Sequence, residues 1–353
     1  QLYSIISTGA CLLKCFLAYL LTCVEGSELL IYGGGLMVIS LMEFLAYVES
    51  VMQLYPECKY KFKVVRKYYS SIVGFSGWTM LGTVSNMFMT QGNVMLINLF
   101  FGPIVNAAFA ISQQISNAFN SFCGSIIMAI RPPMIRSYSE KNYTYLNDVF
   151  EFCNKVQYYA LLCIGFPLFC FMENILCLWL GDVDEVTLSF SKLVIIYIIL
   201  LSMNNPITII VQATGKVKRY FGIVETFTLL CLPVTWILLH MCSDYNVVFY
   251  SMVGVCTFAH VLRIIIVKKE YSQFDVKGYI VRFVVPAVVV TVLDAVFVRV
   301  VELLKISAVT NIVLSTLGST LLILSMFYLV GMRQSEKQMV TGACKSVCNK
   351  FLR

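Results

Sequence analysis

Polar and charged side chains interrupt several long apolar stretches of this sequence, and these side chains are the candidates for chemistry. Lys14 lies near the middle of the apolar stretch 3–24. An isolated ammonium in apolar surroundings is costly, so it marks either a binding site or an ion pair. Lys14 would attract a phosphate or diphosphate group. Alternatively, it pairs with Glu43 or Glu49 of the next apolar stretch and holds two helices together.

Neutral amide side chains form a second group of candidates. They donate and accept hydrogen bonds, which suits sugar hydroxyl groups. The same side chains can instead hold neighbouring helices together. In the stretch 103–130, the spacing of the amides places them on one helical face. The candidate cavity residues from the stretches 72–101 and 103–130 are Asn86, Gln91, Asn93, Asn106, Gln113, Asn117 and Asn120.

Other residues are candidates for bending and coupling. Gly77 and Gly92 can let a helix bend, although small residues also allow close helix packing. Pro206, preceded by Asn205, is expected to kink its helix because proline removes a backbone hydrogen bond. Glu225 can carry a coupling proton, or it can pair with the nearby Lys218 and Arg219.

The sequence does not predict a metal site or a disulfide framework. It has 14 cysteines and two histidines, but no CxxC pair. Several cysteines lie inside apolar stretches, where small packing residues are expected. No cofactor is predicted, apart from H⁺ or Na⁺ as a coupling ion.

The elements that must position these residues are membrane-spanning helices. Of the 353 residues, 59% are hydrophobic and 13% are charged, and the mean hydropathy is +0.81. This is more apolar surface than a soluble core buries. About 20 apolar residues span a bilayer as a helix. Ten stretches qualify, near residues 3–24, 29–52, 72–101, 103–130, 156–180, 186–212, 220–241, 246–267, 279–301 and 306–330.

Charge between the stretches predicts their orientation. Threading them alternately through a bilayer places 22 of the 26 Lys and Arg residues on one side, including Arg263 and the tail 331–353. Positively charged loops are retained in the cytoplasm, so the C-terminus is predicted to be cytoplasmic. The connection 131–155 is expected to be a helix in the headgroup layer or a polar loop. The opposite loops are too short for a catalytic domain, so an enzyme is not expected, and no basic face suggests nucleic-acid binding.

Several strings resemble a known transporter family. They are Phe75-Ser76-Gly77-Trp78, Asn98-Leu99-Phe100-Phe101-Gly102-Pro103, Asn106-Ala107-Ala108, Leu178-Trp179-Leu180-Gly181 and Gln212-Ala213-Thr214-Gly215-Lys216. Together they resemble the polysaccharide biosynthesis and lipopolysaccharide (O-antigen-type) flippases, which are MATE-like members of the multidrug/oligosaccharidyl-lipid/polysaccharide exporter superfamily. The sequence departs from the family pattern at Phe109, where relatives usually carry arginine, and at Arg131-Pro132-Pro133.

The resemblance implies an all-α integral membrane protein with two helical bundles around a central cavity. The family has fourteen spans, so about ten would be present here and the first four would be missing. Residues 1–52 would be helices five and six, followed by a cytoplasmic linker at 53–71. Residues 72–267 would form the C-terminal bundle of helices seven to twelve, and 278–330 the two extra C-terminal helices.

The resemblance also implies a function and partners. The expected activity is flipping of an isoprenoid diphosphate-linked oligosaccharide across the bacterial cytoplasmic membrane by alternating access. Membrane lipids, a polysaccharide polymerase and glycosyltransferases would be its partners. The alternative within the superfamily is an ion-coupled drug or metabolite antiporter, which needs an anionic cavity. A membrane glycosyltransferase or polymerase is disfavoured because the outward loops carry no acidic cluster.

Overall fold

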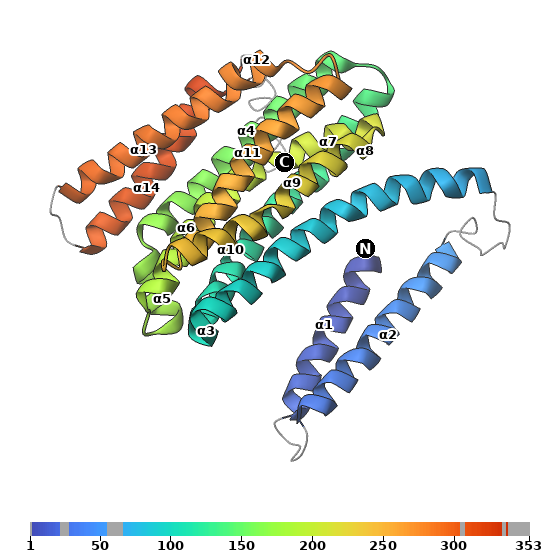
Figure 1. Cartoon of the computed structure of the whole chain (residues 1–353), viewed down its shortest axis with the longest axis horizontal. Helices are drawn as coiled ribbons and strands as arrows, with labels where there is room; N and C mark the ends of the chain where they lie inside the picture. Colours follow the sequence, from blue (N-terminus) through green and yellow to red (C-terminus); the bar gives the residue numbers. More distant parts are fainter. Residues whose placement is uncertain (1, 22–27, 55–65, 304–307, 334–336, 338–353) are drawn as a thin grey trace, which may run out of the picture. The chain divides into compact units, whose positions relative to one another are not determined.

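The structure is a computed structural model that describes residues 2–21, 28–54, 66–303, 308–333 and 337. Within these residues the chain forms only α-helices and short π-helical turns, and no strand (Figure 1). The prediction of an all-α membrane protein is therefore confirmed at this level. The chain divides into unit 1, residues 1–69, and unit 2, residues 70–353, and each is described by itself.

Unit 1 is a pair of packed helices, α1 (Leu2–Leu21) and α2 (Glu28–Leu54). Gly35 lies directly against Leu17, because a Cβ atom at Gly35 would come within 2.6 Å of Leu17 Cδ1. Most of the large apolar side chains on both helices are exposed, for example Phe16 and Phe44. Such faces need an apolar environment, as in a lipid bilayer.

Unit 2 contains the remaining helices, packed around two clusters of buried apolar side chains. Its longest element, α3, passes through a break at Gly102, where φ is 80° and ψ is −172°. The elements are α3 (Arg66–Ser139, starting just before the unit), α4 (Tyr143–Cys170), α5 (Met172–Leu180), α6 (Glu185–Ser202), α7 (Asn204–Thr214), α8 (Val217–Tyr220), η2 (Phe221–Glu225), α9 (Thr226–Leu229), α10 (Cys231–Met241), α11 (Val247–Glu270), α12 (Val276–Tyr279), η3 (Ile280–Val284), α13 (Val285–Leu303), α14 (Ala308–Met326) and η4 (Phe327–Gly331).

Seven helices among the described residues are long and apolar enough to cross a membrane. There are eight if α4 and α5, which meet at a bend of 75°, form one span. The predicted division between 72–101 and 103–130 coincides with the break at Gly102. Within α1, the apolar stretch Ile5–Leu20 is shorter than these seven candidates. The protein is therefore multi-pass, and the number of ten spans stays a prediction.

The segment 131–155 is mostly helical and so is not a polar loop, but its helices are parts of two long helices and not a separate short one. Helix α3 continues through this region to Ser139, and α4 begins at Tyr143 after a tight turn. The rings of Tyr138 and Tyr143 pack against each other and against Tyr271. A position of this segment in the headgroup layer stays a prediction. Buried Met134 anchors the end of α3 in the core. These tertiary contacts stabilise the end of α3 and the start of α4, so both helices extend into the segment that was predicted to connect them.

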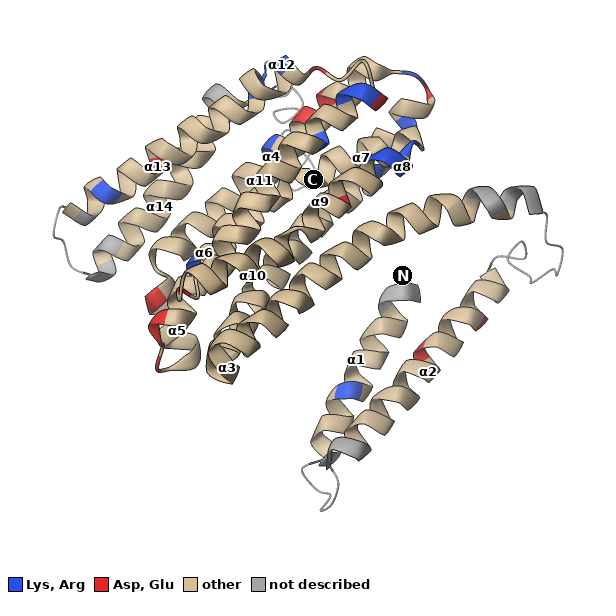
Figure 2. Ribbon diagram, viewed as in Figure 1, with Lys and Arg blue, Asp and Glu red and all other residues tan. Residues whose placement is uncertain are grey.

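Most charged residues of unit 2 lie near its two ends (Figure 2). Lys and Arg dominate the end formed by α8, α12 and the last turn of α11, which we call the basic end. Arg282 and Arg333 both contact Glu151 there, so α4, η3 and the C-terminal segment meet at this end. The loop between α5 and α6 at the opposite end carries acidic residues. This distribution agrees with the charge asymmetry of the sequence, and the cytoplasmic location of the basic end stays a prediction.

Candidate functional site

A cavity with a largely polar lining lies among the otherwise apolar helices of unit 2. It has a volume of about 550 Å³, and we call it the polar cavity. The first half of α3, α7, η2 and α11 form its walls. Its polar lining consists of hydroxyl and amide side chains and one ion pair, namely Ser76, Thr79, Thr83, Asn86, Asn204, Asn205, Thr208, Gln212, Glu225 and Arg263.

A buried ion pair closes one wall of the polar cavity. Arg263 Nη2 lies 3.5 Å from Glu225 Oε1, and the two side chains are 8% and 5% exposed. Glu225 is the last residue of the π-helical turn η2, a wider turn that often occurs at functional sites. The ring of Phe221 in the same turn packs directly over Gly82 of α3. This close approach brings η2 and α3 together at the cavity.

The structure gives Glu225 a different partner from the predicted ones. Arg219 contacts Glu270, and the Lys218 ammonium lies over the Trp78 ring. The prediction that Glu225 forms an ion pair is therefore confirmed, but its partner is Arg263 and not Lys218 or Arg219. Arg263, grouped by charge with the loop residues on one side, lies inside α11. It is buried because its guanidinium neutralises Glu225.

Hydrogen bonds fix several of the other cavity side chains. His260 Nδ1 and Asn204 Oδ1 are 2.7 Å apart, and His260 Nε2 lies 3.3 Å from the Tyr279 hydroxyl. The Thr208 hydroxyl lies 2.9 Å from that of Tyr220. These contacts connect α7 to α8 and to α11, and α11 to α12. They hold the wall in place around the side chains that face the cavity.

Three of the predicted site residues come together at the polar cavity, namely Asn86, Asn205 and Glu225. Asn86 also donates from Nδ2 to the Gly82 carbonyl, at 2.9 Å, as an intrahelical bond. The cavity thus combines amides from α3 and α7 that are more than 100 positions apart in sequence. A wall of neutral donors and acceptors suits a ligand rich in hydroxyl groups.

The other predicted amides do not line the polar cavity. Asn93 is fully buried in the core, whereas Gln91 is exposed on α3. Farther along α3, one amide bonds to the helix itself, since Asn120 Nδ2 donates to Ser116 Oγ at 3.3 Å. Asn117 and Asn120 are exposed on the surface of unit 2, and Asn106 and Gln113 are partly buried.

The predicted bending positions fall into two groups. Helices α6 and α7 are interrupted at Met203, one turn before Pro206, as expected where a proline leaves a carbonyl without its helical donor. Gly92 instead packs closely, because a Cβ there would come within 2.5 Å of Leu232. A Cβ atom at Gly77 would meet no atom of another element within 4 Å in the described structure. The break in α3 lies instead at Gly102, the residue between the predicted stretches 72–101 and 103–130, which is not among the glycines predicted to bend a helix.

Lys14 has a carboxylate partner within unit 1. Its Nζ atom lies 3.7 Å from Glu43 Oε2, and 43% of its side chain is exposed. The pair links α1 to α2, as the structural alternative for Lys14 predicts. The substantial exposure leaves the ammonium accessible to a further anion.

The sequence does not reveal the roles of Arg263 and Thr208 in the polar cavity, nor the packing of Phe109 in the second apolar cluster. Arg263 was counted with the loop charges, although its position inside the apolar stretch 246–267 was a signal that it is buried. Thr208, one turn after Asn204, was not singled out, and a lone threonine in an apolar helix gives little signal. Phe109 is a core residue, fully buried against Phe190 and Phe249.

No group of three His, Cys, Asp or Glu side chains that could hold a metal ion occurs among the described residues. Comparison of the chain with protein-family models, curated proteins and solved structures gives no match.

Proposed function

We propose that this protein is a membrane transporter that flips an isoprenoid diphosphate-linked oligosaccharide between the leaflets of the bacterial cytoplasmic membrane. The observation that carries this proposal is the polar cavity among apolar, membrane-length helices. Irregular or polar surface at membrane depth is tolerated where it lines a cavity. A cavity of this kind gives a glycan a path through an apolar layer.

The composition of the cavity favours a neutral, hydroxyl-rich ligand. Its wall presents the hydroxyls of Thr83 and Thr208 and the amides of Asn86 and Asn205. The charge of Glu225 is balanced by the guanidinium of Arg263. A wall without excess negative charge does not select cationic drugs, so it supports the glycan proposal over the antiporter.

The diphosphate of such a substrate needs a cation, and Lys14 is our candidate. An exposed ammonium whose only described carboxylate partner lies 3.7 Å away is weakly neutralised. In this proposal the breaks at Gly102 and Met203 let helices bend as access alternates. H⁺ or Na⁺ would drive the cycle through Glu225, and a polymerase and glycosyltransferases would use or supply the lipid-linked glycan.

One observation supports a second candidate, an ion-coupled drug or metabolite antiporter. Glu225 supplies a carboxylate at a cavity wall, which is the group that a coupled cation needs. In that case Arg263 would have to move away from Glu225 to uncover the negative charge.

Reconstituted transport tests the proposal. The full chain in proteoliposomes is given a fluorescent isoprenoid diphosphate-linked oligosaccharide, and flipping is measured by the loss of reagent-accessible glycan. The cavity variant Thr83→Val with Asn205→Leu should slow flipping about tenfold, because two hydrogen-bonding groups are lost. The control Thr226→Val changes an exposed threonine that bonds its own helix, from Oγ1 to the Gly222 carbonyl at 2.7 Å.

The flippase proposal fails if the wild-type chain does not flip this lipid, or if the cavity variant and the control flip it equally fast. Uptake or extrusion of an organic cation driven by an ion gradient, and abolished by Glu225→Gln, would favour the antiporter.

A further inference from the structure

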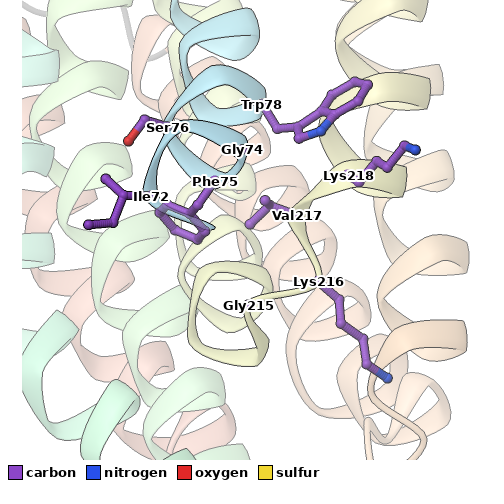
Figure 3. Close-up of a pocket in the computed structure, with 9 residues that line it drawn as sticks. All are labelled: Ile72, Gly74, Phe75, Ser76, Trp78, Gly215, Lys216, Val217 and Lys218. Carbon is purple, nitrogen blue, oxygen red and sulfur yellow. The ribbon is translucent and has the colours of Figure 1, made fainter. Parts of the chain in front are cut away.

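A second cavity opens at the basic end of unit 2, where the start of α3 faces the loop between α7 and α8 (Figure 3). Its volume is about 560 Å³, and we call it the interfacial pocket. Phe75 of α3 lies beside Val217 in the pocket, Lys216 belongs to the opposite loop, and Lys218 belongs to the first turn of α8 (Figure 3). The pocket therefore has apolar side chains on its α3 side and two lysines at the edge formed by the loop and α8.

The charges around this pocket do not cancel. Lys216 Nζ lies 3.9 Å from Glu270 Oε2, but the other oxygen of Glu270 lies 3.3 Å from Arg219 Nη1. One carboxylate is thus shared by two cations. Lys218 forms no ion pair within the described ranges, and its ammonium lies 5.7 Å from the centre of the Trp78 ring. A net positive charge remains at the pocket.

The apolar side chains of the pocket point to a lipid rather than a small soluble anion. Ile72 and Phe75 are 62% and 41% exposed on the first turns of a membrane-length helix. Tryptophan, such as Trp78, is enriched at the height of lipid headgroups, and lysines there bind phosphate. Trp78 is held in place by Gly222, where a Cβ atom would come within 3.3 Å of the indole ring.

We propose that the interfacial pocket binds an anionic phospholipid of the surrounding bilayer. The headgroup phosphate lies between the ammonium groups of Lys216 and Lys218, beside the Trp78 indole. An acyl chain continues along the exposed side chains of Ile72 and Phe75. This site is separate from the polar cavity except for Ser76, which lines both, and it does not depend on the transported substrate.

Lipid titration tests this site in the full chain. The protein is placed in phosphatidylcholine nanodiscs with increasing phosphatidylglycerol, and bound lipid is measured by native mass spectrometry. The double variant Lys216→Gln/Lys218→Gln should bind phosphatidylglycerol about 30-fold more weakly, since each lysine contributes about 1 kcal/mol near a phosphate. The control Lys269→Gln/Lys277→Gln removes two exposed lysines outside the pocket and should change binding less than about threefold.

A variant that should bind phosphatidylglycerol more tightly distinguishes a specific loss of binding from a loss caused by misfolding. Glu270→Gln removes the carboxylate that Lys216 shares with Arg219, so phosphatidylglycerol should bind about fivefold more tightly.

Three results would overturn the proposal. The first is equal weakening by the pocket variant and the control, which would indicate diffuse surface charge. The second is wild-type binding of phosphatidylglycerol no tighter than that of phosphatidylcholine, or no gain in Glu270→Gln. The third is displacement of phosphatidylglycerol by inorganic phosphate or by an isoprenoid diphosphate at lower concentration, which would assign the pocket to that ligand instead.

Discussion

Removal of one partner of the buried ion pair in unit 2 should destabilise the protein strongly. Arg263→Met leaves the carboxylate of Glu225 buried without its cation. At 3.5 Å the attraction between unit charges is roughly 5 kcal/mol for an effective dielectric constant of about 20. The pair has one contact, and Glu225 Oε2 and Arg263 Nε have no hydrogen-bond partner among the described residues. We therefore expect a loss of about 3 kcal/mol, the lower end of the range for buried pairs.

A double-mutant cycle measures this coupling. The free energy of unfolding is determined by detergent-induced unfolding of the purified full chain for wild type, Glu225→Gln, Arg263→Met and the double variant. The double variant has no unpaired charge, so it should be more stable than Arg263→Met alone, with a coupling energy of about 2 kcal/mol. As a control, Arg219→Met breaks a pair with an arginine side chain that is 75% exposed and should cost less than about 1 kcal/mol.

The reasoning is refuted if the four unfolding free energies are additive within about 0.5 kcal/mol. It is also refuted if Arg263→Met is no less stable than Arg219→Met. Either result would mean that the carboxylate is hydrated through the polar cavity and does not need the guanidinium.

Three further predictions concern other parts of the chain. Gly92→Ala should destabilise the protein by up to about 1 kcal/mol, because its Cβ displaces the Cδ atoms of Leu232 while alanine favours the helix, and Leu232→Ala in the same chain should relieve this contact, as checked by thermal unfolding. Lys14→Ala should abolish flipping if its ammonium binds diphosphate, whereas Glu43→Gln should retain it; equal losses in the proteoliposome assay would assign the pair to helix packing. A backbone N–H at the start of α12 and a neighbouring guanidinium hold the pKa of Asp275 below its usual value. Its stabilisation is present above the usual pKa of about 4 and is lost as pH falls through the lowered value, so the melting temperature of wild type should fall more steeply below pH 4 than that of Asp275→Asn.

Membrane character, helix positions and the break near residue 102 could be predicted from the sequence. Apolar length fixes where a helix can span a bilayer, and a glycine followed by proline interrupts a helix regardless of its neighbours. The interruption before Pro206 follows from the same local chemistry. Such features depend on residues close in sequence, so the sequence alone determines them.

Contacts between residues distant in sequence decided which side chains form the candidate site. The sequence shows amides throughout the two halves of α3, but only packing selects Asn86 for the polar cavity and buries Asn93. Glu225 has basic neighbours in sequence, yet a π-helical turn and the approach of α11 direct it to Arg263. The sequence shows which residues share one face of a helix. Which neighbouring helix that face contacts depends on the combined packing of several helices. The chemistry of the candidate site is therefore a property of the tertiary structure, whereas the membrane character is a property of the sequence.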